Sequence, residues 1–193
     1  MKKPDYQQLY QTAETQGGYF TAAQARRVGF TWERLSCNVK TGKFQRARQG
    51  VYRLVQFPAS PYEDLFVAWL QVGEQATVSH ESALVLYDLS DVLPDEIHLT
   101  VPRTASLRRA GLRLHTATLS IGEVTSRNGL PVTTVERTLL DVMRSQLSPT
   151  LVEQAVQAAI RRGLTSPQKL LAQAQKRSQR AWKSMHAILE AIP

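Results

Sequence analysis

The side chains best suited to bind a ligand lie between residues 31 and 53, where cationic and small polar residues alternate. Arginine and lysine pair with phosphate, and arginine, lysine and asparagine can also donate to base edges in the major groove of DNA. Small polar residues between them would let a helix lie deep in that groove. We therefore predict DNA contacts by Thr31, Arg34, Ser36, Asn38, Lys40, Lys43, Arg46, Arg48 and Arg53.

Two short helices must position the first five of these residues. Thr21 and Gln24 have the spacing of a capping box that opens a helix, and Gly29 supplies the turn that follows it. Thr31 has the character of an N-cap for the next helix, which we expect to end at Gly42.

A helical wheel divides this second helix into two faces. The inward face should hold Trp32, Leu35 and Val39. The outward face should hold Glu33, Ser36, Cys37, Lys40 and Thr41, with Arg34 and Asn38 flanking it.

Residues 43–55 alternate between apolar and mostly basic side chains, which predicts two strands of a hairpin with its tip at Gln49 and Gly50. Helix, turn, helix and basic hairpin follow the layout of a winged helix-turn-helix, which inserts one helix into the major groove and lays the hairpin along the backbone. Two alternatives remain: a solvated hairpin without a ligand, or a winged helix that binds protein rather than DNA.

Charge is distributed unevenly along the chain. Residues 1–60 hold ten Lys and Arg against three Asp and Glu, residues 61–150 hold seven against eleven, and residues 151–193 hold seven against two. A basic amino-terminal segment gains from counterion release on DNA, which carries about one charge per 1.7 Å of axis. The basic residues near the carboxyl terminus are explained either by a solvated helix face or by a second surface for DNA or a partner.

Length and composition limit the remaining possibilities. The 193 residues suffice for one large domain or two small ones. A single cysteine, Cys37, rules out a disulfide framework and a cysteine-based zinc site. Neither a secretory signal nor a stretch of about 18 apolar residues is present. We expect a soluble, cytoplasmic protein with no membrane association.

The domains are expected at residues 1–57, the winged helix-turn-helix, and 58–193. The second region reads as two helices, a small antiparallel sheet that includes a strand at residues 97–101, and four helices at the carboxyl terminus. The fold class is therefore α+β. Arg137 and Asp141 are spaced as an i, i+4 ion pair on one of these helices.

The sequence offers little for catalysis. A winged-helix-targeted nuclease is the enzyme alternative, but no acidic residue is followed two places later by lysine, as a restriction-type metal site would need. The histidines are scattered, although His98 and His115 would meet if their strands pair. We predict no catalytic residue, no cofactor and no metal site, and therefore no enzyme.

Five segments, in order, resemble the AbiEi-type antitoxins of type IV toxin–antitoxin systems. They are residues 18–21, 49–54, 78–84, 97–102 and 130–141. The resemblance implies a bacterial antitoxin whose winged head binds inverted repeats in double-stranded DNA upstream of its own operon and represses it. It further implies that the second domain counters a nucleotidyltransferase-type toxin, with or without direct contact.

The resemblance leaves the operator sequence, the toxin and the way it is neutralised open. Two half-sites on DNA would be filled by a weak dimer or by two monomers.

Overall fold

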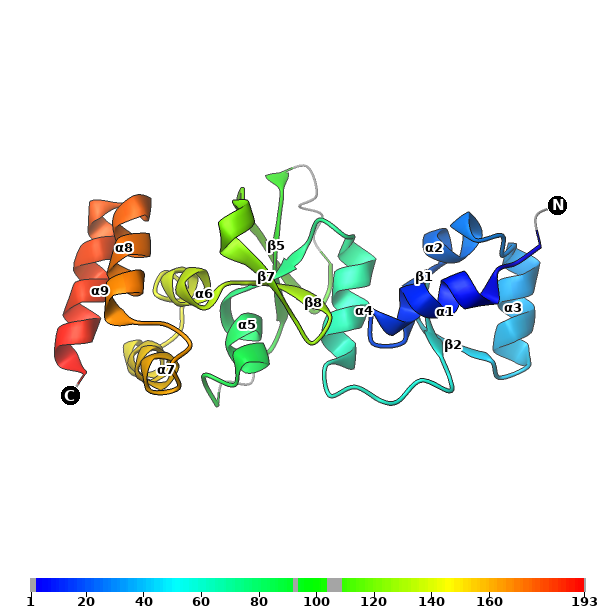
Figure 1. Cartoon of the computed structure of the whole chain (residues 1–193), viewed down its shortest axis with the longest axis horizontal. Coiled ribbons are helices and arrows are strands. Elements are labelled where there is room, and N and C mark those ends of the chain that lie inside the picture. The colour runs from blue at the N-terminus through cyan, green and yellow to red at the C-terminus, as the bar shows by residue number, and fades with distance from the viewer. Residues whose placement is uncertain (1–2, 92–93, 104–108, 193) are drawn as a thin grey trace. The chain divides into compact units, whose positions relative to one another are not determined.

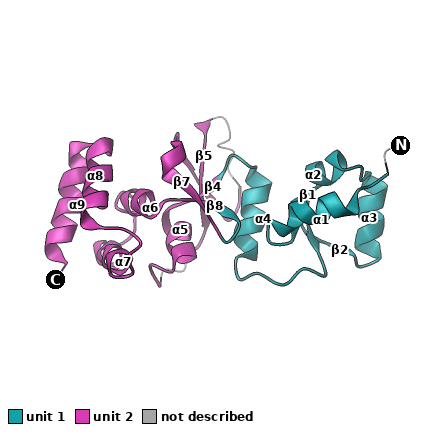
Figure 2. Cartoon of the chain, viewed as in Figure 1, with its two compact units in different colours: residues 1–76, 128–130 teal, residues 77–127, 131–193 magenta. Residues whose placement is uncertain are grey.

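The computed structural model describes residues 3–91, 94–103 and 109–192. The chain divides into two compact units, which Figure 2 distinguishes by colour. The first comprises residues 1–76 and 128–130, and the second comprises residues 77–127 and 131–193. In the parts of the chain that are described, no helix is both long enough and apolar enough to cross a bilayer.

The first unit combines four helices with a three-stranded antiparallel sheet in the order β1-β3-β2 (Figure 1). Its elements are α1 (Tyr6–Glu14), β1 (Tyr19–Thr21), α2 (Ala22–Arg27), α3 (Trp32–Lys40), β2 (Phe44–Arg48), β3 (Val51–Leu54) and α4 (Glu63–Val72).

An aromatic cluster forms the centre of this unit. Phe20, Phe30 and Phe44 are buried, with ring centroids 5.0 Å apart for Phe20 and Phe44 and 5.9 Å apart for Phe30 and Phe44. Leu9 and Leu35 pack into the same core. Burying several large apolar side chains contributes about 1.5–3 kcal/mol each, which fixes α1 and α3 against the sheet.

The helix α4 belongs to the first unit, whereas the sequence placed it in the second domain. Tyr19 of β1 donates a 2.7 Å hydrogen bond to Glu63, and its ring stacks on Phe66 at 6.2 Å. Gly17, at φ 65°, permits this approach, since a Cβ there would lie 2.6 Å from the Phe66 ring. These contacts between distant segments are not visible in the sequence, and they move the boundary from residue 57 to residue 76.

The second unit contains a five-stranded sheet in the order β6-β5-β4-β8-β7, followed by a helical carboxyl-terminal part (Figure 1). Its strands are β4 (Thr77–Val78), β5 (Ile97–Val101), β6 (Leu112–Thr116), β7 (Val124–Arg127) and β8 (Leu130–Thr133). Its helices are α5 (His80–Tyr87), the 3-10 turn η2 (Ile121–Glu123), α6 (Val135–Val142), α7 (Pro149–Arg161), α8 (Pro167–Arg177) and α9 (Gln179–Ala191).

The α+β class and the helical carboxyl terminus are confirmed, but the sheet of the second unit is mixed. Strands β4 and β5 pair antiparallel, whereas β4 with β8 and β5 with β6 pair parallel. Parallel pairing needs a long connection between its strands, and the sequence pattern of short strands does not reveal which connections are crossovers.

Strand β5 is covered on both faces, which corrects the orientation expected for His98. Alternation along the strand predicts that His98 and Thr100 point outward, yet their exposed fractions are 3% and 1%. The amide of His98 donates to Ser82 of α5 at 2.8 Å, and Thr100 donates to Ser79 at 2.8 Å. The α5 segment therefore covers the face that alternation alone assigned to solvent.

Candidate nucleic-acid interface and the charged cluster of the second unit

Helix α3 begins as the sequence indicates, but its inner face is only partly the predicted one. Thr31 is its N-cap, with the side-chain oxygen accepting from the amide of Arg34 at 3.3 Å. Leu35 is fully buried and holds the inner face. Arg34, Ser36 and Lys40 are exposed on the helix, and Lys43 is exposed just after it.

The hairpin β2–β3 presents two arginines to solvent. Arg46 lies opposite Tyr52 and Arg48 opposite Val51, so the register shifts between the two arginines and Ala47 is the extra residue. Such a bulge bends the strand and increases its twist. Both Arg46 and Arg48 are exposed, and Gly50, at φ 77°, makes the turn beyond them.

A DNA contact by Asn38 or Arg53 would require a free side chain. In the structure both side chains are engaged in hydrogen bonds within the first unit. Asn38 is 6% exposed; its amide donates to the carbonyl of Arg34 at 2.7 Å, and its Oδ1 accepts from Tyr6 at 3.2 Å. Arg53 is half-buried and donates to the carbonyl of Phe57 at 2.8 Å. Both side chains therefore tie segments of the first unit together.

Trp32 was expected in the core but is 54% exposed. Phe30, two residues earlier, occupies the core instead. The guanidinium of Arg26 lies 5.4 Å from the centroid of the Trp32 ring, within the range of a cation–π contact. The predicted interface therefore includes an exposed aromatic residue that the helical wheel assigned to the wrong side.

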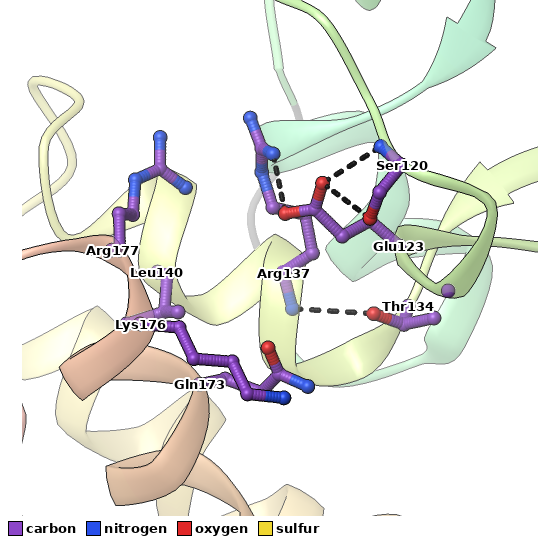
Figure 3. A pocket seen from close by; sticks show the side chains of 9 residues that line it. Ser120, Glu123, Thr134, Arg137, Leu140, Gln173, Lys176 and Arg177 are labelled. Carbon is purple, nitrogen blue, oxygen red and sulfur yellow. Dashed lines mark hydrogen bonds and ion pairs between the residues drawn. The ribbon is translucent and has the colours of Figure 1, made fainter.

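The i, i+4 pair of Arg137 and Asp141 forms as predicted, but it is buried and part of a larger network. Figure 3 shows another part of this network, the bond between Arg137 and Glu123. Arg137 Nε lies 2.8 Å from Asp141, and Arg137 also donates to Glu123 of η2 at 2.6 Å. On the far side of Asp141, a terminal nitrogen of Arg177 lies 2.8 Å from the other carboxylate oxygen. The network joins η2, α6 and α8.

Burial and charge compete within this network. Burial acts to lower the pKa of Arg137, but its hydrogen bonds and charge interactions with Asp141 and Glu123 outweigh burial and raise that pKa. Burial acts to raise the pKa of Glu123, but hydrogen bonds from Ser120 and the Arg137 guanidinium lower it. Arg137 and Glu123 are therefore both ionised at neutral pH.

Three histidines gather beside this network. His115 and His98 approach to 3.4 Å between ring nitrogens, and the rings of His80 and His115 stack at 3.5 Å. His98 and His115 meet because their strands pair, as the sequence predicts, whereas no spacing in the sequence indicates that His80 joins them. In residues 3–91, 94–103 and 109–192, no group of three or more His, Cys, Asp or Glu side chains could hold a metal ion.

All three histidines are neutral at neutral pH. Burial lowers the pKa of His80 to about 2, with further lowering by the charge of His115, His98 and two arginines. Burial, followed by charge interactions with His115 and Arg113, lowers the pKa of His98 to about 4. Burial and then Arg113 lower the pKa of His115.

The second unit defines the class of protein to which the chain belongs. Residues 75–191 match the model of the AbiEi antitoxin C-terminal domain, which covers more than half of the chain, and the chain therefore belongs to the AbiEi antitoxin family. That stretch nearly coincides with the second unit and contains the histidines and the Arg137 network. Membership of this family supports a role as an antitoxin in a toxin–antitoxin system.

Solved structures show a similar fold. The crystal structure of the RV2827C protein from Mycobacterium tuberculosis aligns over 98% of this chain and 78% of that chain, with a TM-score of 0.61 and 13% sequence identity. At this identity the likeness concerns the fold alone. No curated protein matches the sequence.

Proposed function

We propose that the chain is a sequence-specific DNA-binding antitoxin of the type IV class that represses its own toxin–antitoxin operon. The order α1, β1, α2, α3, β2, β3, with β1 pairing to the β2–β3 hairpin, supports a winged helix-turn-helix. In this arrangement α3 is the recognition helix and β2–β3 is the wing.

The observation that carries the proposal is the exposure of cations on both of these elements. Arg34 and Lys40 extend from α3, and Arg46 and Arg48 extend from the bulged hairpin. Among the described residues none of these four is within ion-pair distance of a carboxylate. Their charge is therefore available for phosphate, and binding should weaken with added salt.

The proposed DNA-contact set is smaller than the sequence suggested. It comprises Arg34, Ser36, Lys40, Lys43, Arg46 and Arg48. Thr31 is left out because it caps α3, and Asn38 and Arg53 are left out because their side chains form hydrogen bonds within the first unit.

A gel-shift titration of the full chain on the DNA upstream of its own gene tests the proposal. Arg46→Ala and Arg48→Ala should each weaken binding about tenfold, because each removes charge-assisted hydrogen bonds to phosphate. Each should also lower the salt slope by about one.

Lys169→Ala is the matched control, because it removes one exposed charge from the second unit. An equal loss in Lys169→Ala would mean that only total charge matters and that the wing is not a DNA contact. Cleavage of the bound DNA when Mg²⁺ is added would instead support the nuclease alternative, and binding that ignores salt and competitor DNA would support the protein adaptor.

We further propose that the antitoxin counters a nucleotidyltransferase-type toxin. The family membership of residues 75–191 supports an antitoxin role, and the order of the segments at 78–84, 97–102 and 130–141 supports the AbiEi type. Neutralisation by this second unit need not require a tight complex with the toxin.

A further inference from the structure

A cavity in the second unit is lined by four arginines that come from distant segments. Arg113 lies on β6, Arg137 on α6, Arg144 just beyond α6 and Arg177 at the end of α8. Stacked His80 and His115 form part of the wall, and the cavity has a volume of about 640 Å³. We call it the arginine cleft. A neighbouring cavity of about 350 Å³, drawn in Figure 3, shares Arg137 and Arg177 with it.

The positive charge of the arginine cleft is only partly neutralised. Asp141 is the sole carboxylate among the described residues that line it, and its two oxygens are already taken by Arg137 and Arg177. Arg113 and Arg144 are exposed, and no described carboxylate lies within ion-pair distance of either. A concave surface lined by one sign of charge concentrates its field and favours an oppositely charged ligand.

Arg177 also has hydrogen-bonding capacity beyond its pair with Asp141. One buried terminal nitrogen lies 2.8 Å from a carboxylate oxygen of Asp141. A guanidinium group carries five N–H donors, and this ion pair uses only part of them. The remaining donors can bind an acceptor that enters the cleft.

The histidines give the cleft a neutral wall. Because burial and the nearby arginines hold the pKa of His80 and His115 below the usual value, their rings add no charge at neutral pH. They offer ring nitrogens as donors or acceptors instead. His80 has φ 50°, which is uncommon for a residue with a side chain and orients the first residue of α5.

The depth of the arginines limits the size of the ligand. Arg137 is only 8% exposed, whereas Arg113 and Arg144 are open to solvent. The backbone of a DNA duplex, a broad surface, could touch the outer pair but would not follow the cleft inward to Arg137. A terminal phosphate is narrow, carries up to two charges and presents three oxygens to guanidinium groups.

We propose that the arginine cleft binds a small ligand through a terminal phosphate group, as found in pyrophosphate or a free mononucleotide. Arg113 and Arg144 attract and hold the outer oxygens, and Arg177 donates from within. The site does not depend on the proposed DNA interface, because all of its residues belong to the second unit.

Isothermal titration calorimetry of the full chain at fixed ionic strength tests this proposal, with inorganic pyrophosphate and adenosine monophosphate as probes. The test variant is Arg113→Ala/Arg144→Ala, since both residues are exposed and their loss leaves the buried network intact. The matched control is Arg161→Ala/Lys169→Ala, which removes two exposed cations of the same unit from outside the cleft.

We expect saturable binding of at least one probe that weakens about tenfold or more in the test variant and stays unchanged in the control, because each charge-assisted contact is worth about a factor of ten. Arg46→Ala/Arg48→Ala should also bind the probe normally, so a failure of the DNA proposal would be distinguishable.

Four results would overturn the cleft proposal. The first is absence of saturable binding of both probes, and the second is an equal loss of affinity in the test and control variants. The third is loss of probe binding in Arg46→Ala/Arg48→Ala, which would place the phosphate on the first unit. The fourth is displacement of the bound probe by a short DNA duplex with equal strength whether its 5′ end carries a hydroxyl or a phosphate. This result would assign the cleft to the DNA backbone.

Discussion

At the scale of residues, burial decides the protonation state of three histidines in the second unit. His80, His98 and His115 come from α5, β5 and β6 and share one cluster. Burial is the largest cause of the lowered pKa in each. Two carboxylates lie where they can oppose it: Glu81 is 3.9 Å from His98, and the charge of Asp141 acts to raise the pKa of His115. Neutral rings can pack closely, whereas three imidazolium ions would repel one another.

The histidine cluster predicts a loss of stability in mild acid. In the unfolded chain a histidine titrates near pH 6.5. Below that pH the unfolded state binds protons on these histidines, whereas the folded state does not. The free energy of unfolding therefore falls as the pH is lowered, until the pH reaches the pKa of the folded state. That pKa is about 4 for His98 and about 2 for His80. Each histidine contributes a slope of at most about 1.4 kcal/mol per pH unit.

Urea denaturation at several pH values between 7.5 and 5.0 measures this slope, in a window where carboxylates with ordinary pKa values remain ionised. His98→Gln should make the dependence shallower. His186→Gln, which changes a partly exposed histidine on α9 outside the cluster, is the comparison variant. A free energy of unfolding that stays constant from pH 7 to pH 5 would contradict the assignment of neutral, buried rings.

At the scale of elements, α3 depends on Thr31 for its beginning. The side chain of Thr31 accepts from the amide of Arg34, one of the first helical N–H groups that lack an intrahelical partner. Thr31 was predicted both as this cap and as a DNA contact, and the two roles predict different consequences of mutation.

Thr31→Ala should lower the free energy of unfolding by about 1 kcal/mol, because it removes the cap. Thr31→Ser keeps a hydroxyl at this position and should retain most of that stability. Thermal or urea denaturation followed by circular dichroism gives the comparison. If Thr31→Ala were as stable as the native chain but bound DNA more weakly, the residue would be a contact rather than a cap.

At the scale of the whole molecule, the two units divide the proposed tasks. The exposed cations of α3 and the hairpin lie in residues 1–76, whereas the match to the antitoxin domain covers residues 75–191. Helix α4 completes the first unit through Tyr19, so that unit extends beyond the hairpin.

This division predicts that neutralisation survives the loss of DNA binding. When the Arg46→Ala/Arg48→Ala chain is expressed from an unrelated promoter together with the proposed nucleotidyltransferase-type toxin, growth should recover to the same extent as with the native chain. The measurement is colony formation with the toxin induced, and immunoblotting controls for equal amounts of antitoxin. Failure to recover at equal expression would show that the first unit takes part in neutralisation.

Local signals in the sequence determined much of the first unit. The Thr21–Gln24 capping box forms with both of its hydrogen bonds, and Thr31 caps α3, since capping depends on residues a few places apart. The Gln49–Gly50 turn joins the two strands as expected, and the Arg137–Asp141 pair forms because i, i+4 residues share one helix face. The antitoxin family, too, was indicated by ordered segments of sequence.

Only the tertiary structure decided which polar residues are buried and which distant charges meet. Asn38 is buried because Tyr6 of α1 reaches it, and His98 because α5 covers β5. Arg177 joins Arg137 and Asp141 although α8 lies far along the chain from α6. Burial and long-range charge depend on neighbours that approach through space, so the spacing of residues in the sequence does not reveal the arginine cleft.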